Sequence, residues 1–278
     1  MKKKRIAPMM SLMAALLLAL SLTACANAKQ SLDVENMTTQ ELLAEVEKGD
    51  PAVQNALAVH YQMGIDTEVN TEEAIRLLRL AADQDYAKAQ YNLGVLYHDG
   101  EGIAKDEKMA FELFLKSAQL GFVESQYQVG SCYEHGRGVE NNPEEAVKWM
   151  KKAADQGHVT AQGTMGYYYF TGLCVEENPD EAVKWFQLAA DQGEPTSMFN
   201  LGSCYFQGKG VEKDLKASAM WFGKAGENGV PDGKANLAEC YEKGYGVEKD
   251  MEKALELYHQ AAEEGSDDAK KALERLGK

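Results

Sequence analysis

Residues 161–193 have the sequence AQGTMGYYYFTGLCVEENPDEAVKWFQLAADQG, and the chain after about residue 38 consists of variants of this stretch. One tyrosine recurs every 36 residues, with no insertion or deletion between its copies, at Tyr61, Tyr97, Tyr133, Tyr169, Tyr205 and Tyr241. Separate domains or independent loops would not keep so constant a spacing. The sequence therefore predicts an array of six repeats.

Two recurring residue types mark helix ends within each repeat. A glycine, the residue best suited to the left-handed turn that ends a helix, lies three residues after each tyrosine, at Gly64, Gly100, Gly136, Gly172, Gly208 and Gly244. Six residues later comes a side chain that accepts hydrogen bonds at a helix start, at Asn70, Asp106, Asn142, Asn178, Asp214 and Asp250. Each repeat is thus predicted to be helix A, a loop, helix B and a tight turn.

The second helix of each repeat is expected to end at Asp85, Gly121, Gly157, Gly193, Gly229 or Gly265. One helix A position always holds glycine or alanine, which lets helix B approach closely, at Ala58, Gly94, Gly130, Gly166, Gly202 and Ala238. Two short helices cannot enclose a core, but stacked neighbours can. We therefore predict an all-α, right-handed α-solenoid of six 36-residue helix–loop–helix repeats with capping helices and a concave face lined by helix A.

The pattern A-x-x-x-L-G-x-x-Y-x-x-G-x-G-V followed by A-x-x-W-x-x-x-A-A-x-x-G resembles the Sel-one-like repeat, a relative of the tetratricopeptide repeat. The first half is clearest at 201–211, and the second at 182–193 and 146–157. Copy one departs from the pattern, with Asp66 and Thr67 in place of Gly-Val, and copy four has Cys174 where its neighbours have glycine. The resemblance implies a helical scaffold that binds other proteins.

The first 24 residues have the features of a secretory signal. Lys2, Lys3, Lys4 and Arg5 precede an apolar run that is too short for a usual transmembrane span. The segment ends in LTAC at 22–25, which resembles the bacterial lipobox. The resemblance implies that the Cys25 sulfur carries a lipid and that the chain is cut before it. More than one acyl chain would anchor the protein stably to a membrane.

These patterns divide the chain into a lipoprotein signal peptide at 1–24, a lipidated cysteine and tether at 25–37, and an N-terminal capping helix at 38–50. The repeats follow at 51–266, and a charged C-terminal capping helix closes the chain at 267–278. The six repeats are predicted at 51–86, 87–122, 123–158, 159–194, 195–230 and 231–266.

Charge narrows the choice of partners. Removal of the four basic residues of the signal takes the formal charge from −15 to −19, which argues against nucleic acid and anionic lipid surfaces and suits basic partners. The chain lacks the S-x-x-K, H-E-x-x-H, G-x-S-x-G and P-loop motifs, and its five histidines do not cluster at ligand spacing. We expect no cofactor, no metal, no enzyme activity and a monomeric chain.

The cysteines after Cys25 are predicted to be free. Cys132, Cys204 and Cys240 share one position of the repeat, where equivalent atoms of packed neighbours lie beyond disulfide reach. A cysteine-rich branch of the Sel-one-like family pairs cysteines within each repeat and is linked to β-lactam binding. This chain has at most one cysteine per repeat, so neither feature is implied here.

The concave face is the predicted binding surface. Its inward positions in copies two to five hold mostly aromatic side chains and histidines, at Tyr91, His98, Tyr127, His135, Tyr167, Phe170, Phe199 and Phe206. Equivalent positions in copies one and six hold Asn55, Gln62, Glu239 and Glu242, an arrangement that would resemble an interface core with a polar rim. Gly163 and Glu134 interrupt the central series. Alternatively, these rings pack against the next helices and bind nothing.

We therefore predict a membrane-anchored, extracytoplasmic, non-catalytic scaffold that binds an unknown protein or peptide of the cell envelope. Two alternatives remain at this point. A lipoprotein that binds cell-wall fragments would use the same aromatic groove to stack sugars or hold stem peptides. An enzyme acting on β-lactams would need a nucleophile that no motif supplies.

Overall fold

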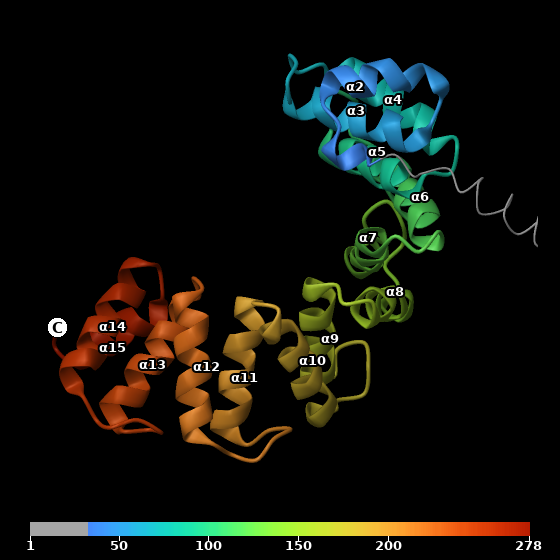
Figure 1. The fold of residues 1–278 in the computed structure, drawn as a ribbon. Coiled ribbons are helices and arrows are strands. Elements are labelled where there is room, and N and C mark those ends of the chain that lie inside the picture. The colour runs from blue at the N-terminus through green and yellow to red at the C-terminus, as the bar shows by residue number, and fades with distance from the viewer. Residues whose placement is uncertain (1–32) are drawn as a thin grey trace, which may run out of the picture.

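The computed structural model describes residues 33–278, and within that range all regular structure is helical (Figure 1). Six antiparallel helix pairs stack in chain order into a curved α-solenoid. Helix A of successive repeats is α3 (Pro51–Met63), α5 (Ala87–Asp99), α7 (Val123–His135), α9 (Val159–Thr171), α11 (Pro195–Gln207) and α13 (Pro231–Lys243). Helix B is α4 (Thr71–Ala82), α6 (Glu107–Gln119), α8 (Pro143–Asp155), α10 (Pro179–Asp191), α12 (Leu215–Glu227) and α14 (Met251–Glu263).

The predicted helix starts are confirmed. The side-chain oxygen of Asn142 accepts a hydrogen bond from Glu145 N at 3.1 Å, and that of Asn178 does the same from Glu181 N at 3.1 Å. Asn70, Asp106, Asp214 and Asp250 make equivalent caps. Because each cap satisfies a backbone N–H that the helix leaves free, it fixes where helix B begins.

The predicted helix ends are also confirmed. Every glycine that follows helix A has a positive φ, between 66° and 76°, as the left-handed cap requires. Asp85, in the turn after α4 where the other repeats have glycine, has φ 56°. Cys174 takes φ 65°, close to the 69–73° of the glycines at its position in other repeats. The loop of repeat 4 therefore keeps the common backbone conformation, although a side chain at positive φ is strained.

Within a repeat, close approach of helices A and B depends on the small residue in helix A. A Cβ atom at Gly166 would lie 2.5 Å from a ring carbon of Phe186 on α10. Gly94 and Gly202 meet Phe114 and Phe222 in the same way, at 2.7 and 2.6 Å. In each of these three repeats, a buried phenylalanine ring of helix B therefore packs directly on the glycine of helix A.

Between repeats, a row of buried glutamines joins neighbouring helix pairs. Gln90, Gln126 and Gln162, each in helix A, donate to the carbonyl oxygen of the alanine near the end of the preceding helix B, at 3.2–3.4 Å. These bonds satisfy carbonyl groups that a helix end leaves free. These hydrogen bonds were not predicted from the sequence. They are confined to repeats 2 to 4, because Met198 and Lys234 replace the glutamine in repeats 5 and 6.

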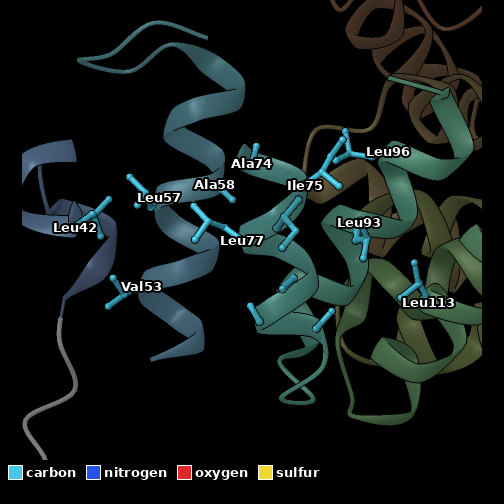
Figure 2. Packing of buried hydrophobic residues seen from close by; sticks show 14 residues of the cluster. Leu42, Val53, Leu57, Ala58, Ala74, Ile75, Leu77, Leu93, Leu96 and Leu113 are labelled. Atoms are coloured by element: carbon cyan, nitrogen blue, oxygen red, sulfur yellow. The ribbon is translucent and has the colours of Figure 1, made fainter. Parts of the chain in front are cut away.

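Both ends of the solenoid are covered by short helices. At the front, α2 (Thr39–Glu45) turns Leu42 toward Val53 and Leu57 of α3 (Figure 2). A 3-10 turn on either side, η1 (Val34–Asn36) and η2 (Val46–Lys48), completes this part. At the back, α15 (Asp267–Arg275) packs on α13 and α14. Both ends of the repeat core are thereby closed against water.

The core positions of the repeat behave as the pattern predicts. Leu93, Met165 and Leu201 are buried, and Trp149, Trp185 and Trp221 are at most 8% exposed. Cys132, Cys174, Cys204 and Cys240 are free thiols. Burial raises the pKa of the Cys132, Cys204 and Cys240 thiols to about 11, so at neutral pH they stay protonated and act as small core residues.

Candidate binding face

The six A helices form one continuous surface, called here the helix-A face. In the upper part of the bend, α5 and α7 lie toward the inside, and their partners α6 and α8 lie toward the outside (Figure 1). A column of half-buried polar side chains runs along this face, one from each of repeats 2 to 6, at Asn92, Gln128, Thr164, Asn200 and Asn236. Amide and hydroxyl groups in such a row can bond to the backbone of an extended segment.

Three depressions follow the helix-A face from repeat 3 to the C-terminal cap. The first, of about 320 Å³, lies over α7, α9 and α11. The second, of about 130 Å³, is lined by Phe206, Asn236 and Tyr245 among others. The third, of about 310 Å³, lies between α13 and α15 and is lined by Asn236, Asp268 and Lys271 among others. Each depression includes a member of the polar column.

The first depression, called here the Gly163 pocket, contains no basic side chain. Its lining residues are Glu134, Thr160, Gly163, Thr164, Tyr167, Glu194, Thr196, Ser197 and Asn200. Glu134 comes from the end of α7, whereas Glu194 caps the start of α11 by accepting from Thr196 N at 3.0 Å and from Ser197 N. The pocket therefore combines two carboxylates with hydroxyl groups, an amide and one aromatic ring.

Most of the predicted aromatic residues contact other rings of the solenoid. The ring centroid of Tyr91 lies 5.8 Å from that of Phe114 and 5.3 Å from that of Phe122, and Tyr127 stacks on His158 at 4.6 Å. These side chains are half-buried. They contribute to packing between helices and leave only part of each ring open to a partner.

The three predicted phenylalanines are half-buried in the same way. Phe170, Phe199 and Phe206 lie 6.2, 5.7 and 5.7 Å from the rings of Phe186, Phe222 and Tyr245, respectively. Phe170 is also covered by the ammonium group of Lys209, 4.1 Å from the ring centre. Of these three, only Phe206 lines one of the depressions described above.

The remaining predicted residues differ in how far they are exposed. His98 bonds through Nδ1 to Glu107 Oε2 at 2.7 Å, and His135 through Nδ1 to the Ser131 carbonyl at 3.0 Å. His135 is exposed, and the Tyr167 side chain is 50% exposed and lines the Gly163 pocket. Tyr167 is thus the predicted aromatic residue most open to a partner. Cys25, the predicted lipid site, lies outside the described residues.

The predicted polar rim is wrong at two positions. Asn55 is 4% exposed and accepts a hydrogen bond from Asn92 at 2.9 Å. Glu242 is 3% exposed and forms ion pairs with Arg275 and Lys243. Both side chains are structural because the neighbouring helix supplies a partner for each, which the sequence of a single repeat does not reveal.

Sequence reasoning also missed the residues that make the Gly163 pocket. Gly163 stands where repeats 2, 3 and 5 have a ring, and Glu134 stands where repeats 4 and 5 have phenylalanine. The signal was present, because both residues interrupt the aromatic series. Only the structure shows that the two interruptions border the same pocket.

Among residues 33–278, no helix is long and apolar enough to cross a membrane. The same range contains no group of three or more His, Cys, Asp or Glu side chains placed to hold a metal ion.

Comparison with known proteins identifies the repeat. A profile of the Sel1 repeat matches residues 51–86, 87–122, 123–158, 160–194, 195–230 and 231–266. These segments cover well over half of the chain, which therefore belongs to the Sel1 repeat family. No curated protein matches the chain.

Two solved structures of the same fold are similar in sequence as well. One is a protective antigen of uropathogenic Escherichia coli with an SLR fold, at 35% identity and a TM-score of 0.81, over 84% of this chain and 50% of that one. The other is a Sel1 repeat protein of Oxalobacter formigenes, at 30% identity and a TM-score of 0.73, over 84% of this chain and 68% of that one. This chain thus spans half the length of the E. coli protein.

Proposed function

We propose that this protein is a non-catalytic scaffold that holds an extended segment of another protein along its helix-A face. Sel1 repeat proteins are in general scaffolds for protein–protein contact. The observation that carries the proposal is the run of three depressions on one face, each lined by a member of the polar column. Successive depressions along one face suit a segment that is bound at several points.

Charge supports a basic partner. Glu134, Glu194, Glu239 and Asp268 line the depressions, and Lys271 and Arg275 are the basic residues among the lining side chains, both at the C-terminal end. An acidic groove attracts a basic segment and raises its rate of association.

Binding should depend on side chains of the helix-A face that do not hold the fold together. Tyr167→Ala combined with Asn200→Ala is expected to weaken binding about thirtyfold, or about 2 kcal/mol, because a truncated interface ring commonly costs that much. The partner is first recovered by affinity capture on the mature protein from detergent-solubilised envelope, and its affinity is then measured with purified components. The thermal midpoint of the variant should stay close to that of the wild type.

The matched control is Leu188→Ala on α10. Leu188 is 48% exposed, about as much as Tyr167, but it belongs to a B helix. This control should bind the partner normally. If Leu188→Ala weakens binding while the double variant does not, recognition lies on the helix-B side and the proposal is wrong.

The proposal includes an extracytoplasmic location with a lipid anchor on Cys25. The basic residues, the apolar run and the LTAC sequence at 22–25 support it. The similar E. coli protein is a protective antigen, and a location outside the cytoplasm would suit a protein of that kind.

The anchor has a direct test. Cys25→Ser is expected to abolish labelling by a fatty-acid analogue, because serine lacks the thiol that receives the lipid. The variant protein should then either move from the membrane fraction to the soluble fraction or remain as the uncleaved precursor. Cys174→Ser is the matched control and should leave labelling and fractionation unchanged. Continued labelling of the Cys25→Ser protein would rule out this lipid site.

A further inference from the structure

The Gly163 pocket exists because repeat 4 lacks a pair of rings that repeats 2 and 3 have. In repeat 2 the ring of Tyr91 lies against Phe122, and in repeat 3 Tyr127 stacks on His158. The corresponding residues of repeat 4 are Gly163 and Glu194. A Cβ atom at position 163 would lie 3.4 Å from Oε2 of Glu194. The space that two rings fill elsewhere is therefore open here and bordered by a carboxylate.

One wall of this pocket contains a hydroxyl group without a partner. Ser197 is 1% exposed, lines the pocket, and its Oγ has no hydrogen-bond partner among residues 33–278. The serine at the same position of repeat 3, Ser125, is also buried, but its Oγ donates to Ser117 Oγ at 2.7 Å. Leaving a buried hydroxyl unpaired costs about 1–3 kcal/mol. Ser197 is thus the kind of group that a ligand would satisfy.

The pocket is negatively charged, and no lysine or arginine lines it. Among the described residues, neither Glu134 nor Glu194 forms an ion pair with lysine or arginine, and Nδ1 of the His135 ring lies 3.8 Å from Glu134 Oε2. Glu194 offsets the positive end of the α11 dipole because its carboxylate accepts from the first backbone N–H groups of that helix. The charge of Glu134 remains available to a cation.

We propose that the Gly163 pocket binds a primary ammonium group of the partner, supplied by a lysine side chain or by a free N-terminus. An ammonium group has three donors and no acceptor, which matches a pocket of carboxylate, hydroxyl and amide oxygens. Ser197 Oγ and the Glu134 carboxylate accept two of these donors, and Thr164 or Asn200 accepts the third. This inference rests on the proposed function, since it names what the helix-A face recognises.

The pocket also has room for the carbon chain that carries the ammonium group. Its volume of about 320 Å³ exceeds what the charged group alone needs, and the half-exposed ring of Tyr167 forms part of its lining. A lysine stem can lie along that ring while its ammonium group reaches the oxygens.

Four amidated pentapeptides of glycine and serine test the proposal. The first is acetylated and carries its one ammonium group on a central lysine. The second has no lysine and carries its one ammonium group at a free N-terminus. The third is acetylated and uncharged, and the fourth is acetylated with a central arginine. Each is titrated into the isotope-labelled mature protein in detergent, and the backbone amide signals of Gly163 and Ser197 are followed by NMR.

At least one ammonium peptide should shift these signals saturably, with a Kd of about 1 mM, as expected for one charge-assisted contact site. The two ammonium peptides show which source the pocket prefers. The uncharged peptide should cause no shift. Equal shifts by the uncharged peptide, or tighter binding of the arginine peptide, would overturn the assignment to a primary ammonium group.

Two variants locate the site. Ser197→Ala and Glu134→Gln are each expected to weaken binding of the ammonium peptide about tenfold. Because Ser197→Ala removes an unpaired hydroxyl, its thermal midpoint should be unchanged or higher. Ser125→Ala is the matched control. It removes a hydroxyl that is hydrogen-bonded to Ser117, so it should lower the thermal midpoint and leave peptide binding intact. Unchanged peptide binding in both Ser197→Ala and Glu134→Gln would show that the ammonium group binds elsewhere.

Failure here is distinguishable from failure of the proposed function. If no ammonium peptide binds but Tyr167→Ala with Asn200→Ala still weakens binding of the captured partner, the helix-A face is a binding surface and only the ammonium site is wrong. If neither effect is seen, both proposals are wrong.

Discussion

Gly166→Leu is expected to lower the free energy of unfolding by about 3 kcal/mol, at the upper end of the usual cost of overpacking a core. A Cβ at Gly166 would already lie 2.5 and 2.6 Å from two ring carbons of Phe186, so even the first side-chain carbon has no space. The ring cannot move aside freely because Phe186 is fully buried. The remaining option is to separate α9 from α10, which opens the core of repeat 4.

The repeats themselves provide a control for this variant. Where helix A has glycine in repeats 2, 4 and 5, helix B has phenylalanine, whereas repeat 1 pairs Ala58 with Leu78. Gly166→Ala combined with Phe186→Leu recreates the repeat 1 pair and should stay within about 1 kcal/mol of the wild type, because the two volume changes oppose each other.

Stability is measured by urea and thermal unfolding of the mature protein. For a domain of this size, about 3 kcal/mol corresponds to a fall of about 6–12 °C in the thermal midpoint. A Gly166→Leu protein that keeps the wild-type midpoint would show that α9 and α10 do not pack through this glycine.

The sequence predicted the fold closely because the signals that set it are local and repeated six times. The cap at Asn142, for example, joins its side chain to a backbone N–H three residues away, so the residue type alone indicates the helix start. The left-handed glycine at Gly172 is local in the same sense. The buried Gln90 was not predicted, since its partner, the Ala82 carbonyl, is defined only when two repeats are stacked.

The candidate site was predicted less well for a related reason. Tyr91 and Phe199 were assigned to the groove from their position on helix A, but each ring also meets a ring of the adjacent helix, on Phe114 and Phe222. Whether a helical residue faces a groove or a seam depends on how far the neighbouring side chain reaches. A pocket formed by missing rings leaves no positive signal in the sequence of one repeat.

Glu242→Gln is expected to loosen the C-terminal cap and to lower stability by about 3 kcal/mol at neutral pH. The Glu242 carboxylate accepts hydrogen bonds from Arg275 of α15 at 2.6 and 3.0 Å and from the Tyr258 hydroxyl of α14 at 3.0 Å, and Lys243 lies 2.6 Å away. It therefore joins α13, α14 and α15. These partners, Arg275 foremost, lower the pKa of Glu242 to about 2 against the desolvation that burial imposes.

The pH dependence follows from that lowered pKa. An unfolded glutamate has a pKa of about 4.3, so the ionised form contributes its full stabilisation above that pH and loses it as the pH falls from there toward 2. The fall in the pKa of Glu242 from about 4.3 to about 2 corresponds to about 3 kcal/mol of stability. Glutamine resembles the protonated, neutral side chain. The difference in stability between wild type and variant should thus be constant above about pH 5 and shrink below about pH 4.3.

Hydrogen exchange of the α15 amides measures the effect where it arises, because an end helix of a solenoid can open without the rest. At pH 6 the α15 amides of Glu242→Gln should exchange about a hundredfold faster than those of the wild type, and at pH 3.5 the ratio of the two rates should be smaller. Glu239→Gln, on the exposed side of α13, is the matched control and should change exchange little. A ratio that stays the same at both pH values would mean that the shape of the Glu242 side chain, and not its charge, holds the cap on the last repeat.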